Sequence, residues 1–144
     1  MRESAAVELL ADELRNLTGW GVENPGRLAR TLVLSELAQI DPSLSPTTAG
    51  CVIRRYLVEA VRSFEGSREF LGRSYDAQTL QRAFVLSLGL AQAHLSAPIR
   101  QYRVVKLLGL AYSYDQWRKS PRLQRGLLTL LAEWMMSRHL SSER

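Results

Sequence analysis

Apolar side chains recur along most of the chain every three or four residues, which is the spacing of amphipathic helices. Residues 46–65 show this most clearly, because Ile53, Leu57 and Phe64 fall on one helical face. Charged side chains such as Arg55 fall on the opposite face. The pattern is typical of a helix that packs one side on a core and exposes the other.

Helix starts are indicated by a capping side chain followed by proline, because proline lacks an N–H that would have no partner in the first turn. Asn24-Pro25, Ser45-Pro46 and Ser120-Pro121 each have this order. No segment shows the alternation and turn signals that are typical of a β-hairpin. The predicted helices are residues 4–17, 25–40, 46–65, 77–95, 98–113 and 121–140, with a short turn at 68–72.

The fourth predicted helix is apolar on every side over residues 83–93, as expected of the central helix of a domain. A chain of 144 residues also has the length of one ordinary domain. We therefore predict an all-α protein in which residues 1–144 form a single compact bundle of about six helices.

Residues 30–54 and 82–106 resemble each other at a fixed offset of 52. Each contains an apolar run, a break with Ser and Pro, and a second run, which suggests two degenerate stacked helical hairpins with flanking helices. Coincidence in a leucine-rich helical chain is the alternative. Stacked helical units usually present binding surfaces. The identical pairs are Arg30/Arg82, Val33/Val85, Leu34/Leu86, Ser35/Ser87, Pro46/Pro98 and Val52/Val104.

Charge is distributed unevenly between the two halves of the chain. Residues 1–72 hold 8 Arg and 10 acidic residues, a net charge of −2, whereas residues 73–144 carry +7. Of the 19 basic residues 17 are Arg, a side chain that makes bidentate contacts to phosphate or carboxylate. We expect the second half to attract anionic partners and the first half not to do so.

The remaining composition favours a cytoplasmic protein that does not enter a membrane. One cysteine, Cys51, cannot form an internal disulfide, and we expect it to be buried in the core. The start of the chain lacks the basic and apolar segments of a signal peptide. The longest uncharged stretch, residues 83–99, contains too many polar residues to span a bilayer.

Catalytic motifs are not evident in the chain, so we expect neither an enzyme nor a bound cofactor or metal. The sequence lacks phosphate-binding glycine loops, His-Glu-x-x-His and Cys-x-x-Cys. His94 and His139 lie in different predicted helices without acidic neighbours at ligand spacing, and we expect both to be structural. Glu8, Asp12 and Glu13 crowd one predicted helix and are interpreted as a solvated face.

The segment between residues 99 and 125 is the candidate binding site, because it holds seven basic residues and a single acidic one. Cationic side chains neutralise phosphates, and exposed aromatic rings stack on unpaired bases. Tyr114 and Trp117 either serve this purpose or anchor a loop, while Tyr102 and Tyr112 are predicted to be core. The predicted nucleic-acid-binding residues are Arg100, Arg103, Lys106, Arg118, Lys119, Arg122 and Arg125.

These observations favour a non-catalytic helical binding module whose basic C-terminal half contacts the nucleic-acid backbone. A small, basic, all-helical chain is similar in composition to the small accessory subunits of RNA-guided nucleoprotein complexes, although no motif carries that similarity and no residue role follows from it. The alternative is a protein–protein adaptor that binds an acidic protein surface without nucleic acid. Either module could act as a homo-oligomer or as a subunit of a larger complex.

Overall fold

The computed structural model describes residues 2–19, 22–91 and 94–142, which form eight helices and one two-stranded antiparallel hairpin. The predicted all-α class is confirmed, with the hairpin as a small addition. The elements are α1 (Arg2–Leu17), α2 (Pro25–Ala29), α3 (Val33–Leu37), α4 (Pro46–Arg62), β1 (Arg68–Phe70), β2 (Arg73–Tyr75), α5 (Ala77–Leu88), α6 (Ala97–Leu108), α7 (Tyr114–Arg118) and α8 (Pro121–Ser142).

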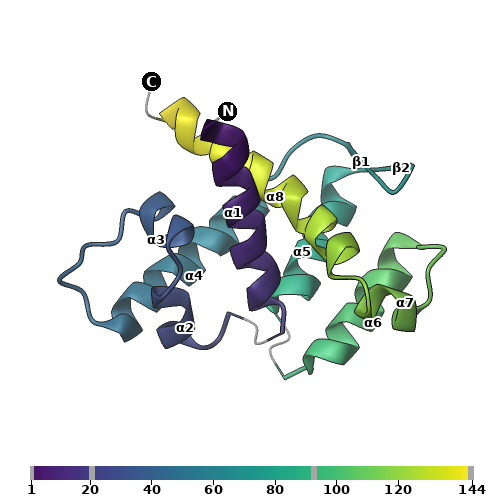
Figure 1. The fold of residues 1–144 in the computed structure, drawn as a ribbon, viewed down its shortest axis with the longest axis horizontal. Coiled ribbons are helices and arrows are strands. Elements are labelled where there is room, and N and C mark those ends of the chain that lie inside the picture. Colours follow the sequence, from purple (N-terminus) through teal and green to yellow (C-terminus); the bar gives the residue numbers. More distant parts are fainter. Residues whose placement is uncertain (1, 20–21, 92–93, 143–144) are drawn as a thin grey trace.

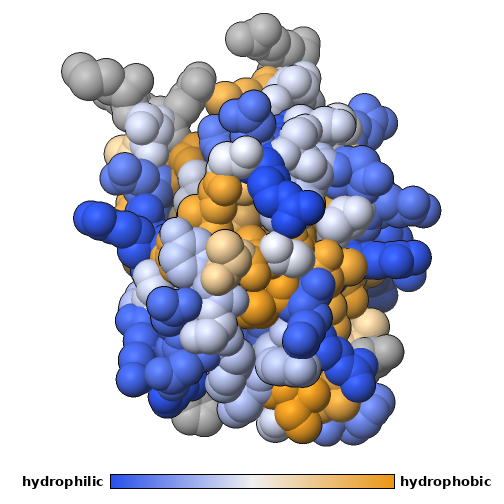
Figure 2. Space-filling view, turned by 90° about the vertical axis from the view of Figure 1, so that its right-hand side faces the viewer, coloured by the Kyte–Doolittle hydropathy of each residue, from blue (hydrophilic) through white to orange (hydrophobic). Residues whose placement is uncertain are grey.

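Two long helices, α1 and α8, pack against each other at the centre of the molecule (Figure 1). Helices α2, α3 and α4 lie on one side of this pair, whereas α5, α6, α7 and the hairpin lie on the other (Figure 1). On the face seen from the right of Figure 1, apolar residues reach the surface among hydrophilic ones (Figure 2). On each side one helix pair dominates the packing, α2 with α4 and α5 with α6. No helix in the described ranges is long and apolar enough to cross a membrane.

The buried apolar side chains form one continuous cluster that draws on both sides of the molecule. Leu57 of α4, Phe84 of α5 and Leu131 of α8 are fully buried within it. Phe64 packs edge-on against Phe84, with ring centroids 5.1 Å apart, and also against Trp134. Burying each such side chain contributes roughly 1.5–3 kcal/mol to folding, so this cluster holds the helices together.

Helix α4 confirms the predicted amphipathic face, because Ile53 is buried and Arg55 is exposed. Cys51 is exposed, so the prediction that it is a core residue was wrong. The neighbouring Gly50 takes the buried position, and a Cβ there would meet atoms of Pro25 at 2.4 Å. Glycine thus lets α2 approach the backbone of α4 closely, which turns Cys51 toward solvent.

The predicted helix over residues 25–40 is in fact two short helices, because a carboxylate from another helix interrupts it. Glu13 of α1 accepts hydrogen bonds from the backbone N–H groups of Leu32, Val33 and Leu34 at 2.7, 2.9 and 3.0 Å. These are donors at the start of α3 that lack helical partners. The side chain of Glu13 therefore starts a new helix at this point.

Further differences lie at glycines that adopt a left-handed conformation. Gly89 ends α5 at φ 69° and Gly109 ends α6 at φ 59°, so the predicted helices 77–95 and 98–113 are both shorter than expected. Leu71 and Gly72 have φ of 52° and 80°, as a two-residue hairpin turn requires. The sequence did not suggest this hairpin, because leucine is an unusual residue at such a turn.

The two similar segments of the sequence are not packed alike. In the second segment α5 packs directly on α6, whereas in the first α4 packs mainly on α2, which precedes residue 30. The helix at the corresponding place in the first segment, α3, has only five residues. The similarity therefore reflects helix starts and apolar positions, and it does not pair equivalent hairpins.

Arg100 was predicted to contact nucleic acid, but its side chain is buried and only 4% exposed. Its guanidinium donates hydrogen bonds to the carbonyl oxygens of Thr18, Leu86, Ser87 and Leu95 at 2.9–3.4 Å. Burial lowers the pKa of Arg100, although an arginine remains cationic at neutral pH. The charge therefore serves the fold, because it joins the ends of α1 and α5 to the start of α6.

Replacing Arg100 with Leu should lower the free energy of unfolding by about 3 kcal/mol, because the substitution leaves buried carbonyl groups without donors. Urea denaturation followed by circular dichroism measures this change. The matched variant Arg122→Leu alters an exposed arginine of α8 and should stay within about 0.5 kcal/mol of the parent. Equal stability of the two variants would contradict the structural role of Arg100.

Candidate functional site

The other six predicted basic residues lie on or beside three helices, α6, α7 and α8. Arg103 and Lys106 are exposed on α6, and Arg118 and Lys119 lie at the end of α7. Arg122 and Arg125 lie in the first turns of α8. Arg125 forms an ion pair with Asp12 of α1 and also donates to the carbonyl oxygen of Glu8. Its charge thus joins α8 to α1 and is already balanced within the protein.

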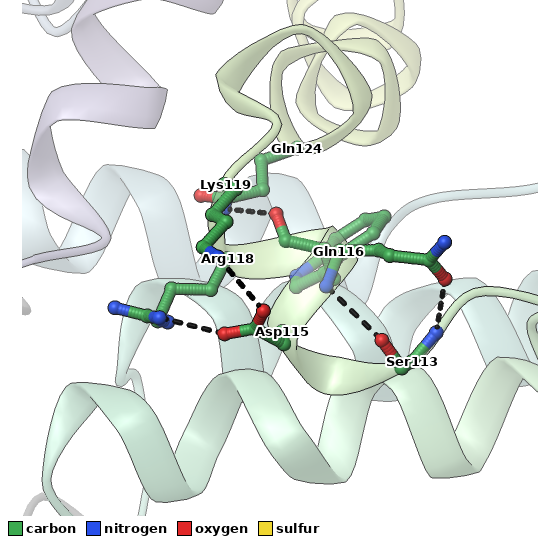
Figure 3. A network of polar contacts seen from close by, with 7 residues as sticks. Ser113, Asp115, Gln116, Arg118, Lys119 and Gln124 are labelled. Atoms are coloured by element: carbon green, nitrogen blue, oxygen red, sulfur yellow. Dashed lines mark hydrogen bonds and ion pairs between the residues drawn. The ribbon is translucent and has the colours of Figure 1, made fainter.

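Arg118 and Lys119 share one carboxylate, that of Asp115 (Figure 3). The nitrogen–oxygen distances are 2.6 Å to Arg118 and 3.0 Å to Lys119. Hydrogen bonds from Arg118 and then Lys119 hold the pKa of Asp115 below its usual value, so the carboxylate stays ionised at neutral pH. The three side chains together keep one net positive charge, and all are largely exposed.

Short-range contacts fix the place of α7. Ser113 accepts a hydrogen bond from the backbone N–H of Gln116, and the Gln116 side chain accepts one from the backbone N–H of Ser113 (Figure 3). Trp117 is fully buried, and its indole N–H donates to the side-chain oxygen of Gln101 at 2.8 Å. Gln124 of α8 donates to the backbone oxygen of Trp117. Trp117 is therefore an anchor and cannot stack on a base.

Two other aromatic side chains are exposed, contrary to the prediction that they belong to the core. Tyr102 is 47% exposed and Tyr112 is 37% exposed. Tyr102 packs edge-on against Tyr114 with ring centroids 6.2 Å apart, and the Lys106 ammonium lies 5.6 Å from the Tyr102 ring centroid. This aromatic pair of Tyr102 and Tyr114 with Lys106 beside it offers flat ring surface next to positive charge.

A cleft of about 830 Å³ lies where α1, α2, α6, α7 and α8 meet. Arg118 and Tyr114 of α7 line it, and Gln101 and Gln124 contribute amide groups. Three more of its lining residues are arginines from the first half of the chain, Arg15, Arg27 and Arg30. We call this cavity the arginine cleft. Its volume falls within the range of ordinary ligand pockets, which is about 300–1,000 Å³.

The arginine cleft draws three of its four arginines from the first half of the chain, which was expected not to attract anions. That expectation summed charges along the sequence, whereas folding brings three arginines of the first half beside Arg118. Arg15 lies in the last turn of α1 and Arg27 in the last turn of α2. The helix dipole stabilises a cation at this end of a helix. Helix ends that converge therefore bring their basic side chains together.

The acidic counterpart of these arginines is already engaged. Glu13 is the one acidic side chain among the described residues that line the cleft, and both of its oxygens accept hydrogen bonds at the start of α3. By contrast, the Nε atom of Arg15 is buried and has no hydrogen-bond partner. Arg15 thus keeps one buried donor that no described residue satisfies.

The start of α6 adds to the positive potential of the cleft. Ala97 and Pro98, in the first turn of this 12-residue helix, line the cavity. The side chain of Ser96 caps no backbone N–H there. The N-terminal end of a helix carries a partial positive charge, so this end favours the same ligands as the arginines do.

The geometry of the described residues does not suggest a metal site. Across residues 2–19, 22–91 and 94–142, no group of three or more His, Cys, Asp or Glu side chains could hold a metal ion. His94 is exposed, and His139 lies in the last turn of α8. Comparison with protein-family models, curated proteins and solved structures found no match. The arginine cleft is the candidate site because of its charge and shape.

Replacing Asp115 with Asn should strengthen anion binding about twofold, because Arg118 would lose the carboxylate that competes with a ligand. Titration with inorganic pyrophosphate at low salt, followed by calorimetry, measures the affinity. The matched control is Asp41→Asn, which changes another exposed carboxylate outside the cleft and should leave the affinity unchanged. An equal gain in both variants would point to net charge alone.

Proposed function

We propose that this protein is a non-catalytic nucleic-acid-binding module that holds phosphate groups in the arginine cleft. The observation that carries this proposal is the convergence of Arg15, Arg27, Arg30 and Arg118 on one cavity. Arginine matches the oxygen geometry of phosphate and stays charged at all physiological pH values. The proposal keeps the predicted function and the predicted contact Arg118, and it adds Arg15, Arg27 and Arg30 of the first half.

A polymer fits this surface better than a small free anion does. Tyr114 lines the cleft and contacts Tyr102 outside it, and Lys106 lies beside Tyr102. The positive charge and the aromatic rings therefore continue from the cavity onto the exposed face of α6. A chain of nucleotides with phosphates in the cleft could place its next base on the aromatic pair.

An unpaired strand suits this arrangement, because its bases are free to stack on aromatic side chains. The exposed ring of Tyr102 offers such a face. Paired bases keep their faces covered by their neighbours and would meet only the charged groups. We therefore propose a short single-stranded segment as the ligand and an accessory subunit of a nucleoprotein complex as the role.

The double variant Arg15→Ala/Arg30→Ala should weaken binding of a fluorescein-labelled twelve-nucleotide oligothymidine about tenfold or more at 0.1 M salt, because two phosphate contacts are lost. The plot of log affinity against log salt should become shallower by about 1.4, since each contact to a single strand contributes about 0.7. Fluorescence anisotropy over a salt series measures both quantities.

The matched control is Arg55→Ala/Arg138→Ala, which removes the same charge outside the cleft. Arg138 lies 14 residues beyond Gln124 on α8, about 21 Å along the helix axis. An equal loss in the two double variants would reduce the effect to net charge and sink the proposed site. Binding of an acidic peptide by the cleft, with indifference to oligothymidine, would instead favour the adaptor function.

Replacing Tyr114 with Ala should weaken binding of single-stranded oligothymidine by about fivefold or more, because each stacked base contributes roughly 1–3 kcal/mol. Binding of a duplex of the same length should change less than twofold, since its bases stay stacked on each other. The control Tyr112→Ala alters an exposed tyrosine that does not line the cleft. Equal losses for strand and duplex would argue against base stacking.

A further inference from the structure

A second cavity of about 440 Å³ lies where α4, α5 and α6 meet, and its lining differs from that of the arginine cleft. We call it the apolar groove. Its apolar lining comes from all three helices and from the segment between α5 and α6. The residues are Val61 of α4, Val85 and Leu86 of α5, Ala91 after α5, and Leu107 of α6. The two cavities share none of their lining residues.

The side chains of the groove lie where the helical spacing brings them together. On α5, Val85 and Leu86 follow Gln81 and Arg82 by three to five residues, so they share one face of the helix. Leu107 of α6 follows Arg103 by four residues and shares its face in the same way. Val85, Leu86 and Leu107 are only partly buried, so apolar surface remains available for a ligand.

Positive charge surrounds this apolar floor. Arg62, Arg82 and Arg103 line the groove, one from each of the three helices, and all three are exposed. The described residues that line the groove include no acidic side chain. Gln81 is held in place, because its amide donates to the backbone oxygens of Arg62 and Phe64. The rim therefore has one sign of charge, and Gln81 has a fixed position on it.

Charge and shape together indicate what covers the groove. Apolar surface bordered by polar groups marks a site of protein interaction, and a groove between helices commonly receives the apolar face of another helix. Three arginines around the groove would attract carboxylates on the flanks of that helix and repel basic ones. A purely apolar segment would offer the three arginines no carboxylate to pair with.

We propose that the apolar groove binds an acidic amphipathic helix of a partner protein. The helix places apolar residues at intervals of three and four on the floor, and its flanking carboxylates pair with Arg62, Arg82 and Arg103. This interaction is independent of phosphate binding in the arginine cleft. The protein would then carry two separate binding surfaces, one for nucleic acid and one for protein.

The test uses two labelled helical peptides that differ only in flanking charge. Both carry leucine at positions 1, 4, 8 and 11 of a 14-residue amphipathic design, and one has glutamates where the other has lysines. Fluorescence anisotropy with the full chain should show at least tenfold tighter binding of the glutamate peptide, since like charges at the rim repel the lysine peptide.

Charge reversal separates recognition from loss of folding. The variant Arg62→Glu/Arg82→Glu should lose at least tenfold in affinity for the glutamate peptide and gain affinity for the lysine peptide. A misfolded protein would bind neither peptide better. The control Arg122→Glu reverses an exposed charge on α8 that does not line the groove and should leave both affinities unchanged.

Three outcomes would overturn the proposal. The first is equal binding of the two peptides, and the second is a charge-reversal variant that keeps the preference of the parent. The third is a dimer in sedimentation that dissociates in Val85→Glu, because a second copy of the chain would then cover the groove. Oligothymidine binding should be unchanged in Val85→Glu, so a failure here is distinguishable from a failure of the arginine cleft.

Discussion

The fold depends on the hydrogen bonds that one buried cation, the guanidinium of Arg100, makes inside the protein. A guanidinium removed from water would be strongly unfavourable unless its donors found acceptors. Here the acceptors are backbone carbonyls of Thr18, Leu86, Ser87 and Leu95, most of which lie at helix ends where carbonyls lack helical partners. The side chain of Arg100 thus donates hydrogen bonds to carbonyl groups at the ends of more than one helix. The positions of α1, α5 and α6 are set relative to each other at this point.

The arginine cleft is built directly on that junction. Leu17 and Thr18 at the end of α1 and Ala97 and Pro98 at the start of α6 line the cavity, and Arg100 joins those two segments. The buried Gln101 carries the arrangement on to Trp117, and so to α7. Residues that hold the junction thus also line the cleft, Thr18 and Gln101 among them, whereas Arg100 itself does not line it.

Apolar spacing and capping signals were enough to predict those elements whose structure is decided by their own residues. The buried face of α4 and the starts of α4 and α8 were correctly placed, because apolar spacing and capping signals are local. The break before α3 was not predictable, since a carboxylate of α1, Glu13, determines it. The hairpin turn at Leu71 was missed for a similar reason, because the surrounding structure imposes its unusual backbone conformation.

The candidate site of the structure shares only Arg118 with the seven residues that were predicted from the sequence. On α6, Arg100 and Gln101 take core positions because carbonyl oxygens and an indole N–H satisfy them, and Tyr102 is turned outward as a result. Polar residues that are buried only through distant partners cannot be recognised from spacing. Summing charge by sequence halves also misses the cleft, since Arg15 and Arg118 line one cavity only in the folded chain.

The basic side chains that line the cleft are all arginines, which determines how the cleft responds to pH. Neither histidine of the chain lines the cavity, and both oxygens of Glu13 already accept hydrogen bonds from backbone donors. Arginine does not lose its proton at any pH that a cell reaches. Under the proposed function, the cleft would bind anions across this whole pH range rather than act as a pH switch. Competing anions and ionic strength would then set its occupancy, and release of a bound strand would require a rival for the arginines.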